Sequence, residues 1–343
     1  MKYLLSLALL FLSLLSFYSC GDDIVINNNG GSPTADFDVY LYKVKENPLR
    51  YSTYTIKMDG TNLKLFNDSL IVSTRSKQNR ILLVKIDTMG MFISAIYHAE
   101  TNGSNLVRIP MGSNNTDYFD LSPDGNKFLF TSMYSSILNI MNNDGSGLVQ
   151  LSSSVTGNQF APKFSPNGQL IAFIETSAPA FVKGLYITNT TGTYKKLLKD
   201  SIYTSGSFNL DWSPDGSRIV YQHSLNNSSE SRICVVDTSG SGYTIITSGS
   251  SPAWSPLGDK ICFTDVLDPS GVDIFLINPD GSDRVNITNS TTLFEGNMFW
   301  STDGSKILYS SEGMFFPPYC SIYDMNSNSN RILADSINGA IWK

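Results

Sequence analysis

The stretch Trp212-Ser213-Pro214-Asp215-Gly216, followed at once by the apolar run Ile219-Val220-Tyr221, decides the fold of this chain. Five copies of the unit recur, with 42 to 48 residues between successive serines. The other four copies are Leu121–Gly125, Phe164–Gly168, Trp254–Gly258 and Trp300–Gly304. Each copy runs into a strand that is apolar on both faces. Such strands indicate a sheet that is stacked between two other sheets.

This unit, in its full form Ser-Pro-Asp-Gly at 122–125 and 213–216, has the residues of a tight hairpin turn. Pro sets φ at the first corner, Asp or Asn tolerates the second, and Gly accepts the left-handed exit. We therefore interpret Asp124, Asp215 and Asp303 as turn-forming residues. A catalytic role for these acids is the alternative.

A second unit alternates with the first and predicts a further hairpin. One copy is the turn Pro279-Asp280-Gly281, which is preceded by the apolar run Ile274–Ile277 and followed by Arg284–Ile287. The other copies are Met58–Gly60, Thr101–Gly103, Asn143–Gly145, Thr190–Gly192, Thr238–Gly240 and the degenerate Met325–Ser327. One repeat therefore carries four strands, and ~40–45 residues per four-stranded unit is the range of a propeller blade.

The two ends of the chain complete each other in this repeat pattern. Ala340-Ile341-Trp342 aligns with Phe299-Trp300, but no strand follows it, whereas Phe37–Tyr42 and Tyr54–Lys57 lack an innermost partner strand. We predict an all-β fold: a seven-bladed β-propeller of four-stranded antiparallel blades, closed by pairing of the C-terminal strand with the N-terminal blade. Six blades with a loose N-terminal hairpin is the alternative.

On these repeats the chain resembles the propeller of the TolB family, periplasmic proteins of the Tol envelope system. Similar repeats occur in the propellers of prolyl-oligopeptidase-type peptidases and of oligogalacturonate lyases. The resemblance covers residues 37–343 and rests on Trp-Ser-Pro-Asp-Gly followed by Ile-x-Phe or Ile-x-Tyr. TolB proteins also have an N-terminal α/β domain, which residues 21–60 could not supply. The resemblance therefore implies the fold but not the Tol role.

Residues 1–19 resemble the signal peptide of a bacterial lipoprotein. Met1-Lys2 gives a positive start, Tyr3–Tyr18 is leucine-rich and uncharged, and Ser19 precedes Cys20. The resemblance implies lipidation of Cys20 and a membrane anchor in the bacterial cell envelope, with the outer membrane expected and a periplasmic or surface orientation left open. An ordinary secretory signal with an incidental cysteine is the alternative. Residues 20–35 are polar and glycine-rich, which predicts a flexible tether before a single propeller domain at 36–343.

The composition argues against nucleic acid as a partner. The 343 residues include 24 Lys and Arg against 30 Asp and Glu, for a net charge of −6. Nucleic-acid binding needs a basic footprint that displaces counterions, and this chain lacks such an excess of positive charge. Apolar residues make up 41%, enough for a sizeable core. We expect a monomer.

The sequence offers few candidates for catalysis, and we expect no enzyme activity, metal or other cofactor. It has no Gly-x-Ser-x-Gly motif of a serine hydrolase. Its histidines, His98 and His223, are too few for the metal site that the resemblance to pectate-type lyases implies, and we interpret both as strand-end residues. Cys234, Cys262 and Cys320 are interpreted as buried thiols, with a Cys234–Cys262 disulfide as the alternative.

Function is therefore expected at the mouth of the propeller, where the loops that enter the innermost strands gather around the axis. Aromatic residues beside acids and amides suit a peptide or glycan surface, and packing of these aromatics between blades is the alternative. The first hypothesis is a non-enzymatic envelope module that binds a protein or peptide; the second is a polysaccharide-binding or degenerate lyase-like propeller. The candidate residues are Asp117, Tyr118, Phe160, Tyr203, Phe208, Phe294, Glu295 and Asn297.

Overall fold

The computed structural model describes the chain as a succession of β-strands and turns. The described residues are 39–46, 49–75, 80–86, 93–110, 116–132, 137–151, 157–177, 182–202, 209–224, 230–268, 271–290, 293–313, 316–335 and 339–342. Within these ranges every regular element is a strand. The same ranges hold no helix of the length and apolarity that a membrane crossing requires.

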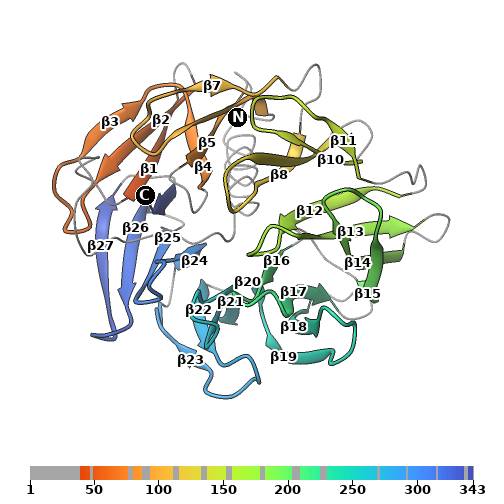
Figure 1. Ribbon diagram of the computed structural model, residues 1–343. Coiled ribbons are helices and arrows are strands. Elements are labelled where there is room, and N and C mark those ends of the chain that lie inside the picture. Colours follow the sequence, from red (N-terminus) through yellow and green to blue (C-terminus); the bar gives the residue numbers. More distant parts are fainter. Residues whose placement is uncertain are drawn as a thin grey trace.

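The strands form antiparallel sheets that are arranged around a common centre (Figure 1). In the described part of the chain, five sheets have four strands each and one has eight. The four-stranded sheets, each from its innermost strand outward, are β28(Gly339–Trp342)-β1(Val39–Glu46)-β2(Leu49–Ile56)-β3(Lys64–Asn67), β4(Ile71–Arg75)-β5(Arg80–Ile86)-β6(Ile93–Glu100)-β7(Val107–Arg108), β8(Thr116–Leu121)-β9(Lys127–Ser132)-β10(Leu138–Asn142)-β11(Val149–Gln150), β12(Gln159–Phe164)-β13(Leu170–Ser177)-β14(Val182–Asn189)-β15(Lys195–Ile202) and β16(Leu210–Trp212)-β17(Arg218–Ser224)-β18(Ser231–Asp237)-β19(Thr244–Ser248).

The eight-stranded sheet consists of two successive repeats. It contains β20(Ser250–Trp254), β21(Ile261–Asp268), β22(Gly271–Ile277), β23(Val285–Asn286), β24(Leu293–Trp300), β25(Lys306–Gly313), β26(Phe316–Asp324) and β27(Ser329–Asp335). A single parallel pair, Val272 with Phe294, joins β22 to β24, whereas the other pairings in this sheet are antiparallel. We divide the sheet at this pair and number the four-stranded units as blades 1 to 7, beginning with the sheet of β28 and β1.

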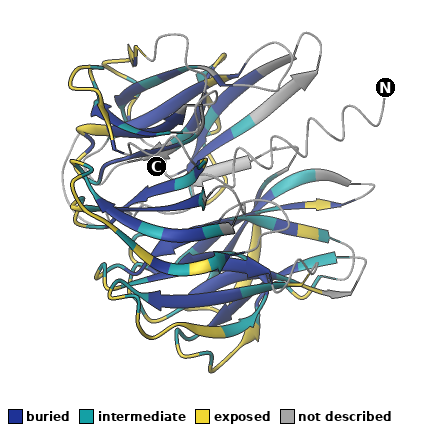
Figure 2. Cartoon of the chain, turned by 90° about the vertical axis from the view of Figure 1, so that its right-hand side faces the viewer, coloured by how far each residue is buried: buried dark blue, intermediate teal, exposed yellow. Residues whose placement is uncertain are grey.

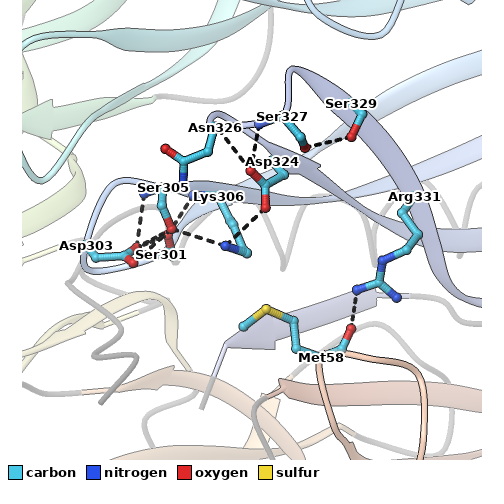
Figure 3. A network of polar contacts seen from close by, with 10 residues as sticks. All are labelled: Met58, Ser301, Asp303, Ser305, Lys306, Asp324, Asn326, Ser327, Ser329 and Arg331. Atoms are coloured by element: carbon cyan, nitrogen blue, oxygen red, sulfur yellow. Dashed lines mark hydrogen bonds and ion pairs between the residues drawn. The ribbon is translucent and has the colours of Figure 1, made fainter. Parts of the chain in front are cut away.

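The predicted antiparallel propeller and its closure are confirmed. β28 pairs antiparallel with β1 from Val39 opposite Trp342 to Tyr42 opposite Gly339, so the C-terminal strand is the innermost strand of blade 1. A second contact links blades 7 and 1 at the outer edge, where the Arg331 guanidinium donates a hydrogen bond to the Met58 carbonyl (Figure 3). Pairing of the chain ends removes an open edge that a linear array of sheets would leave.

Blade packing follows from strands that are apolar on both faces. Ile219, Val220 and Tyr221 of β17 are almost completely buried. Ile219 and Tyr221 pack in one cluster with residues of blade 4, whereas Val220 packs with Trp254 of blade 6 in another. One strand therefore supplies the core on both sides of its blade, and Figure 2 shows long buried segments in many of the strands.

The Ser-Pro-Asp-Gly units form turns between the first and second strands of the blades. The Ser301 hydroxyl donates to Asp303 at 2.6 Å and accepts the Lys306 amide at 2.8 Å (Figure 3). Asp215 has the same contact with Ser213, and these hydrogen bonds lower the pKa of Asp215 to about 2. The interpretation of Asp124, Asp215 and Asp303 as turn-forming residues is supported, since Asp124 also accepts from its neighbour Ser122.

These turns define one face of the propeller. A Cβ added to Gly168 would lie 3.6 Å from Pro123 of the preceding turn, and one added to Gly216 would lie 3.8 Å from Pro166. Successive turns thus lie side by side around the ring. We call this side, which also holds the turns between third and fourth strands, the turn face. The opposite side, where the innermost strands begin, is the mouth.

Candidate functional site

Two of the predicted mouth aromatics pack against each other. Tyr118 of β8 and Phe160 of β12 meet edge to face, with ring centroids 5.8 Å apart. Both are half-buried, and both pack against the cluster around Leu210 and Trp212. For this pair the structure shows packing between blades 3 and 4, the alternative considered for such residues.

Three innermost strands carry the same β-bulge near the mouth. The bulges lie between Phe160 and Lys163 in β12, Ser250 and Ala253 in β20, and Gly296 and Phe299 in β24. In each bulge one residue has a positive φ: 47° at Ala161, 52° at Ser251 and 52° at Asn297. A bulge adds a residue to one strand and so changes which side chains face the core. The recurrence makes it a feature of the repeat.

The bulge in β24 turns an aromatic ring outward. Trp300 and Met298 face the interior, and uninterrupted alternation would place Phe294 on the same side. Because the extra residue shifts the alternation, Phe294 is 44% exposed and its neighbour Glu295 only 6% exposed. Val266, near the mouth end of β21, is also exposed. Blades 6 and 7 therefore present two apolar side chains to solvent at the mouth.

Glu295 lies in a polar region between these two blades. Its carboxyl group is hydrogen-bonded to Thr288 and close to Asp273. Asp273 accepts hydrogen bonds from the amide and hydroxyl of Ser290, both at 2.9 Å. Ser311 is paired with Glu295 across β24 and β25. Glu295 Oε2 and the Ser311 hydroxyl are both buried, and neither has a hydrogen-bond partner among the described residues.

Burial raises the pKa of Glu295 to about 7, and the negative charge of Asp273 acts in the same direction. A buried carboxyl group that lacks a full set of donors is held in its neutral form because desolvation penalises the charge. Glu295 is thus a buried, titratable neighbour of the exposed Phe294.

The pKa of Glu295 predicts a pH-dependent stability. The folded protein keeps a proton that the unfolded chain, with an ordinary Glu pKa of 4.5, has lost, so stability falls as pH rises from 4.5 to about 7. Glu295→Gln should reduce this fall by about 3 kcal/mol, which urea unfolding at about pH 5 and about pH 8 measures. An unchanged pH dependence in the variant contradicts the assignment.

The remaining candidates have different positions. Asn297 donates a hydrogen bond to the Ser310 hydroxyl at 2.9 Å, which ties the bulge to β25. Asp117 lies on β8, but its side chain is outside the described residues. Tyr203, Phe208 and Cys20 also lie outside them. The structure therefore places Phe294, Glu295 and Asn297 on one strand, and Tyr118 with Phe160 on another pair of blades.

Sequence reasoning missed a charged group on the innermost strands. Asp120, Lys163 and Asp211 each stand two residues before the serine of their repeat unit. The Lys163 ammonium group bonds Asp211 Oδ1 at 2.7 Å. Asp120 and Asp211 each accept a backbone amide from the next blade, Phe164 at 2.8 Å and Trp254 at 2.7 Å. This inner charged group links blades 3 to 6.

Burial dominates the electrostatics of this inner charged group. It raises the pKa of Asp120 to about 7, although Lys163 and the backbone amide of Phe164 act against it. Burial likewise raises the pKa of Asp211, despite the ion pair with Lys163. Their backbone contacts give these residues a role in joining blades, and their recurrence two positions before the serine was the available sequence signal.

The histidines and cysteines are buried in strands. His98 lies on β6 and His223 on β17, near the ends of strands in different blades, and burial lowers the pKa of both. Cys234, Cys262 and Cys320 are buried thiols that are not in disulfide bonds, as interpreted. Among the described residues no three His, Cys, Asp or Glu side chains come together as a possible metal-binding set.

The chain was compared with protein families and with individual known proteins. No family model matches the chain. Dipeptidyl-peptidase 5 of Porphyromonas endodontalis is 26% identical over 157 residues, which is 42% of this chain and 22% of that protein. The match thus spans about a fifth of that relative's length.

Solved structures with the same architecture come from several proteins. A candidate TolB of Agrobacterium tumefaciens has a TM-score of 0.52 and 21% identity, over 67% of this chain and 84% of its own. Oligogalacturonate lyase of Vibrio parahaemolyticus has a TM-score of 0.60 and 12% identity, over 88% and 87%. The β-propeller domain of the Trilobed protease of Pyrococcus furiosus has a TM-score of 0.63 and 10% identity, over 93% and 99%. The chain is a TolB-like β-propeller in fold, and at these identities the likeness extends to the fold alone.

Proposed function

We propose that this protein is an envelope lipoprotein whose propeller acts as a non-enzymatic interaction module, with a protein or peptide bound at the mouth. The observation that carries the proposal is Phe294. Its ring is held at the mouth end of an innermost strand, and the bulge at Asn297 turns it to solvent. Aromatic side chains on rigid elements are the residues that most often supply the main energy of a protein interface.

The neighbours of Phe294 suit such a role. Val266 adds a second exposed apolar side chain, and the parallel pair of Val272 with Phe294 fixes the junction of blades 6 and 7. An anchor residue on a preformed surface loses little conformational freedom on binding, which favours affinity. The lipid anchor is proposed at Cys20, on the resemblance of the first residues to a lipoprotein signal.

Site-specific cross-linking tests this function in cells. A photoreactive phenylalanine analogue is placed at position 294 in the full, lipidated chain, and at position 257 as a control, since Leu257 is exposed on the turn face. We expect a defined protein adduct from position 294 and none from position 257. Adducts only from position 257 contradict binding at the mouth.

Cys20→Ala should move the protein from the membrane pellet to the soluble envelope fraction. Retention of this variant in the pellet contradicts the lipid anchor.

Polysaccharide handling is the second candidate, because the fold is shared with an oligogalacturonate lyase. Incubation of the purified chain with oligogalacturonate and Mn²⁺ distinguishes polysaccharide handling from the proposed non-enzymatic interaction module. Our proposal expects no unsaturated product and no binding of the oligosaccharide. Turnover that is lost in His98→Ala or His223→Ala contradicts the non-enzymatic role.

A further inference from the structure

The N-terminal segment joins the propeller on the turn face. β1 begins at Val39, which pairs with Trp342. The equivalent pairs in blades 6 and 7, Trp254 with Ile261 and Trp300 with Ile307, directly flank the turns at 255–258 and 301–304. Val39 therefore lies where blade 1 would have its own turn of this kind, on the side opposite the mouth.

The mean reach of the preceding segment favours some positions of an anchor at Cys20 over others. Eighteen residues, 21–38, separate Cys20 from Val39, and most of them belong to the predicted flexible tether. A flexible chain of this length has a mean end-to-end distance of about 23 Å. An eight-residue strand such as β13 is itself about 26 Å long. The mean reach of the tether is thus no greater than the height of one blade, which separates its attachment point from the mouth. The turn face, in contrast, lies beside the attachment point.

The edge of the turn face carries a repeated apolar feature. In blades 1 to 5 the residue directly before the outermost strand is Leu or Tyr, and each of these side chains is between 36% and 60% exposed. These residues are Leu63, Leu106, Leu148, Tyr194 and Tyr243. The exposed leucines can bury apolar surface in a bilayer, and a tyrosine such as Tyr194 suits the boundary between lipid and water, where its ring is buried and its hydroxyl stays hydrated. The Tyr243 hydroxyl instead contacts the Cys234 thiol, so Tyr243 offers only its ring to the rim.

Charge does not draw this face to an anionic surface. Asp59, Asp144 and Asp280 lie in turns on the same face, and hydrogen bonds from the following Thr or Ser hydroxyl lower the pKa of each. These carboxylates are ionised at neutral pH and would repel anionic lipids. The tether and the apolar rim are therefore the two features that favour the membrane, and a zwitterionic bilayer is the suitable surface.

We infer that the anchored propeller holds its turn face, with the rim of Leu63, Leu106, Leu148, Tyr194 and Tyr243, toward the membrane and directs its mouth away from it. This orientation rests on the lipid anchor of the proposed function and deepens it. A partner that binds at the mouth would then approach from the aqueous compartment, not along the bilayer that holds the anchor.

Fluorescence quenching in vesicles tests the orientation. The full lipidated chain carries Leu148→Cys on the rim or Phe294→Cys at the mouth, labelled with an environment-sensitive thiol dye. Cys234, Cys262 and Cys320 are buried, which favours labelling of the introduced thiol. The protein is reconstituted into phosphatidylcholine vesicles with and without a lipid that bears a nitroxide on its headgroup.

We expect the dye at position 148 to lose most of its fluorescence when the nitroxide lipid is present and the dye at position 294 to keep it. Equal or stronger quenching at position 294, in protein that sediments with the vesicles, overturns the orientation and leaves the anchor intact. Failure of the lipidated chain to sediment with the vesicles overturns the anchor and the orientation with it. In a Cys20→Ala background, sedimentation and quenching should both be lost.

Discussion

A chain that lacks Ala340–Lys343 is expected to melt at a much lower temperature than the full chain, or to aggregate. These residues include all of β28 except Gly339; β28 is the innermost strand of blade 1 and closes the ring on β1. Its loss opens the edge of β1 and uncovers Val39 and Leu41, which are almost completely buried. Removal of large core side chains costs roughly 3–5 kcal/mol, against a typical net stability of ~5–15 kcal/mol.

The matched control is a deletion at the other end of the chain. Removal of Gly21–Ser32, part of the predicted tether, should leave the melting temperature unchanged because this segment has no apolar pattern to pack. Thermal unfolding followed by circular dichroism compares the two. Equal and small effects would show that the chain ends do not stabilise one blade, and six blades with a loose N-terminal hairpin would then be preferred.

Lys163→Ala is the second substitution with a large expected effect. It leaves the buried Asp211 without its ion-pair partner at 2.7 Å, and both side chains are less than a tenth exposed. Removal of one partner from a buried ion pair costs about 3–5 kcal/mol. The matched control is Lys199→Ala, which breaks the exposed pair with Asp200 and should cost about 0–1 kcal/mol.

The pH dependence separates lost charge from lost packing in Lys163→Ala. Without the ammonium group the pKa of Asp211, already raised by burial, rises further. The folded variant then binds a proton that the unfolded chain has lost, so its deficit in stability should be larger at about pH 8 than at about pH 5. A deficit that is the same at both pH values, or no larger than that of Lys199→Ala, contradicts the charge-based account.

The repeat made most of the fold predictable from sequence. Ser-Pro-Asp-Gly fixes a turn by local contacts alone, so the five turns and the strands after them followed from residues that are close in sequence. One of the departures from Ser-Pro-Asp-Gly is informative. In blade 6, Leu257 replaces the turn acid, and Ser255 donates instead to Asp259 at 2.9 Å, which preserves the turn. Closure was predictable because both chain ends showed incomplete repeats.

The candidate site was less predictable because its geometry depends on contacts between blades. The exposure of Phe294 and the burial of Glu295 follow from the bulge at Asn297, and no local pattern marks a bulge with a non-glycine residue at positive φ. Lys163 and Asp211 are 48 positions apart in sequence and meet only because β12 and β16 are innermost strands of adjacent blades. Tyr118 and Phe160 are of the residue types that are typical of a binding surface, but their side chains pack against each other.

The affinity of the partner captured at position 294 tests the central claim most directly. Its dissociation constant is measured for the full chain, for Phe294→Ala and for Leu257→Ala, which removes an even more exposed apolar side chain from the turn face. Binding at the mouth predicts that Phe294→Ala weakens the complex about tenfold or more, the effect of an interface anchor worth at least ~1.4 kcal/mol. Leu257→Ala should leave the constant unchanged. Loss of affinity in Leu257→Ala with full affinity in Phe294→Ala would contradict the account.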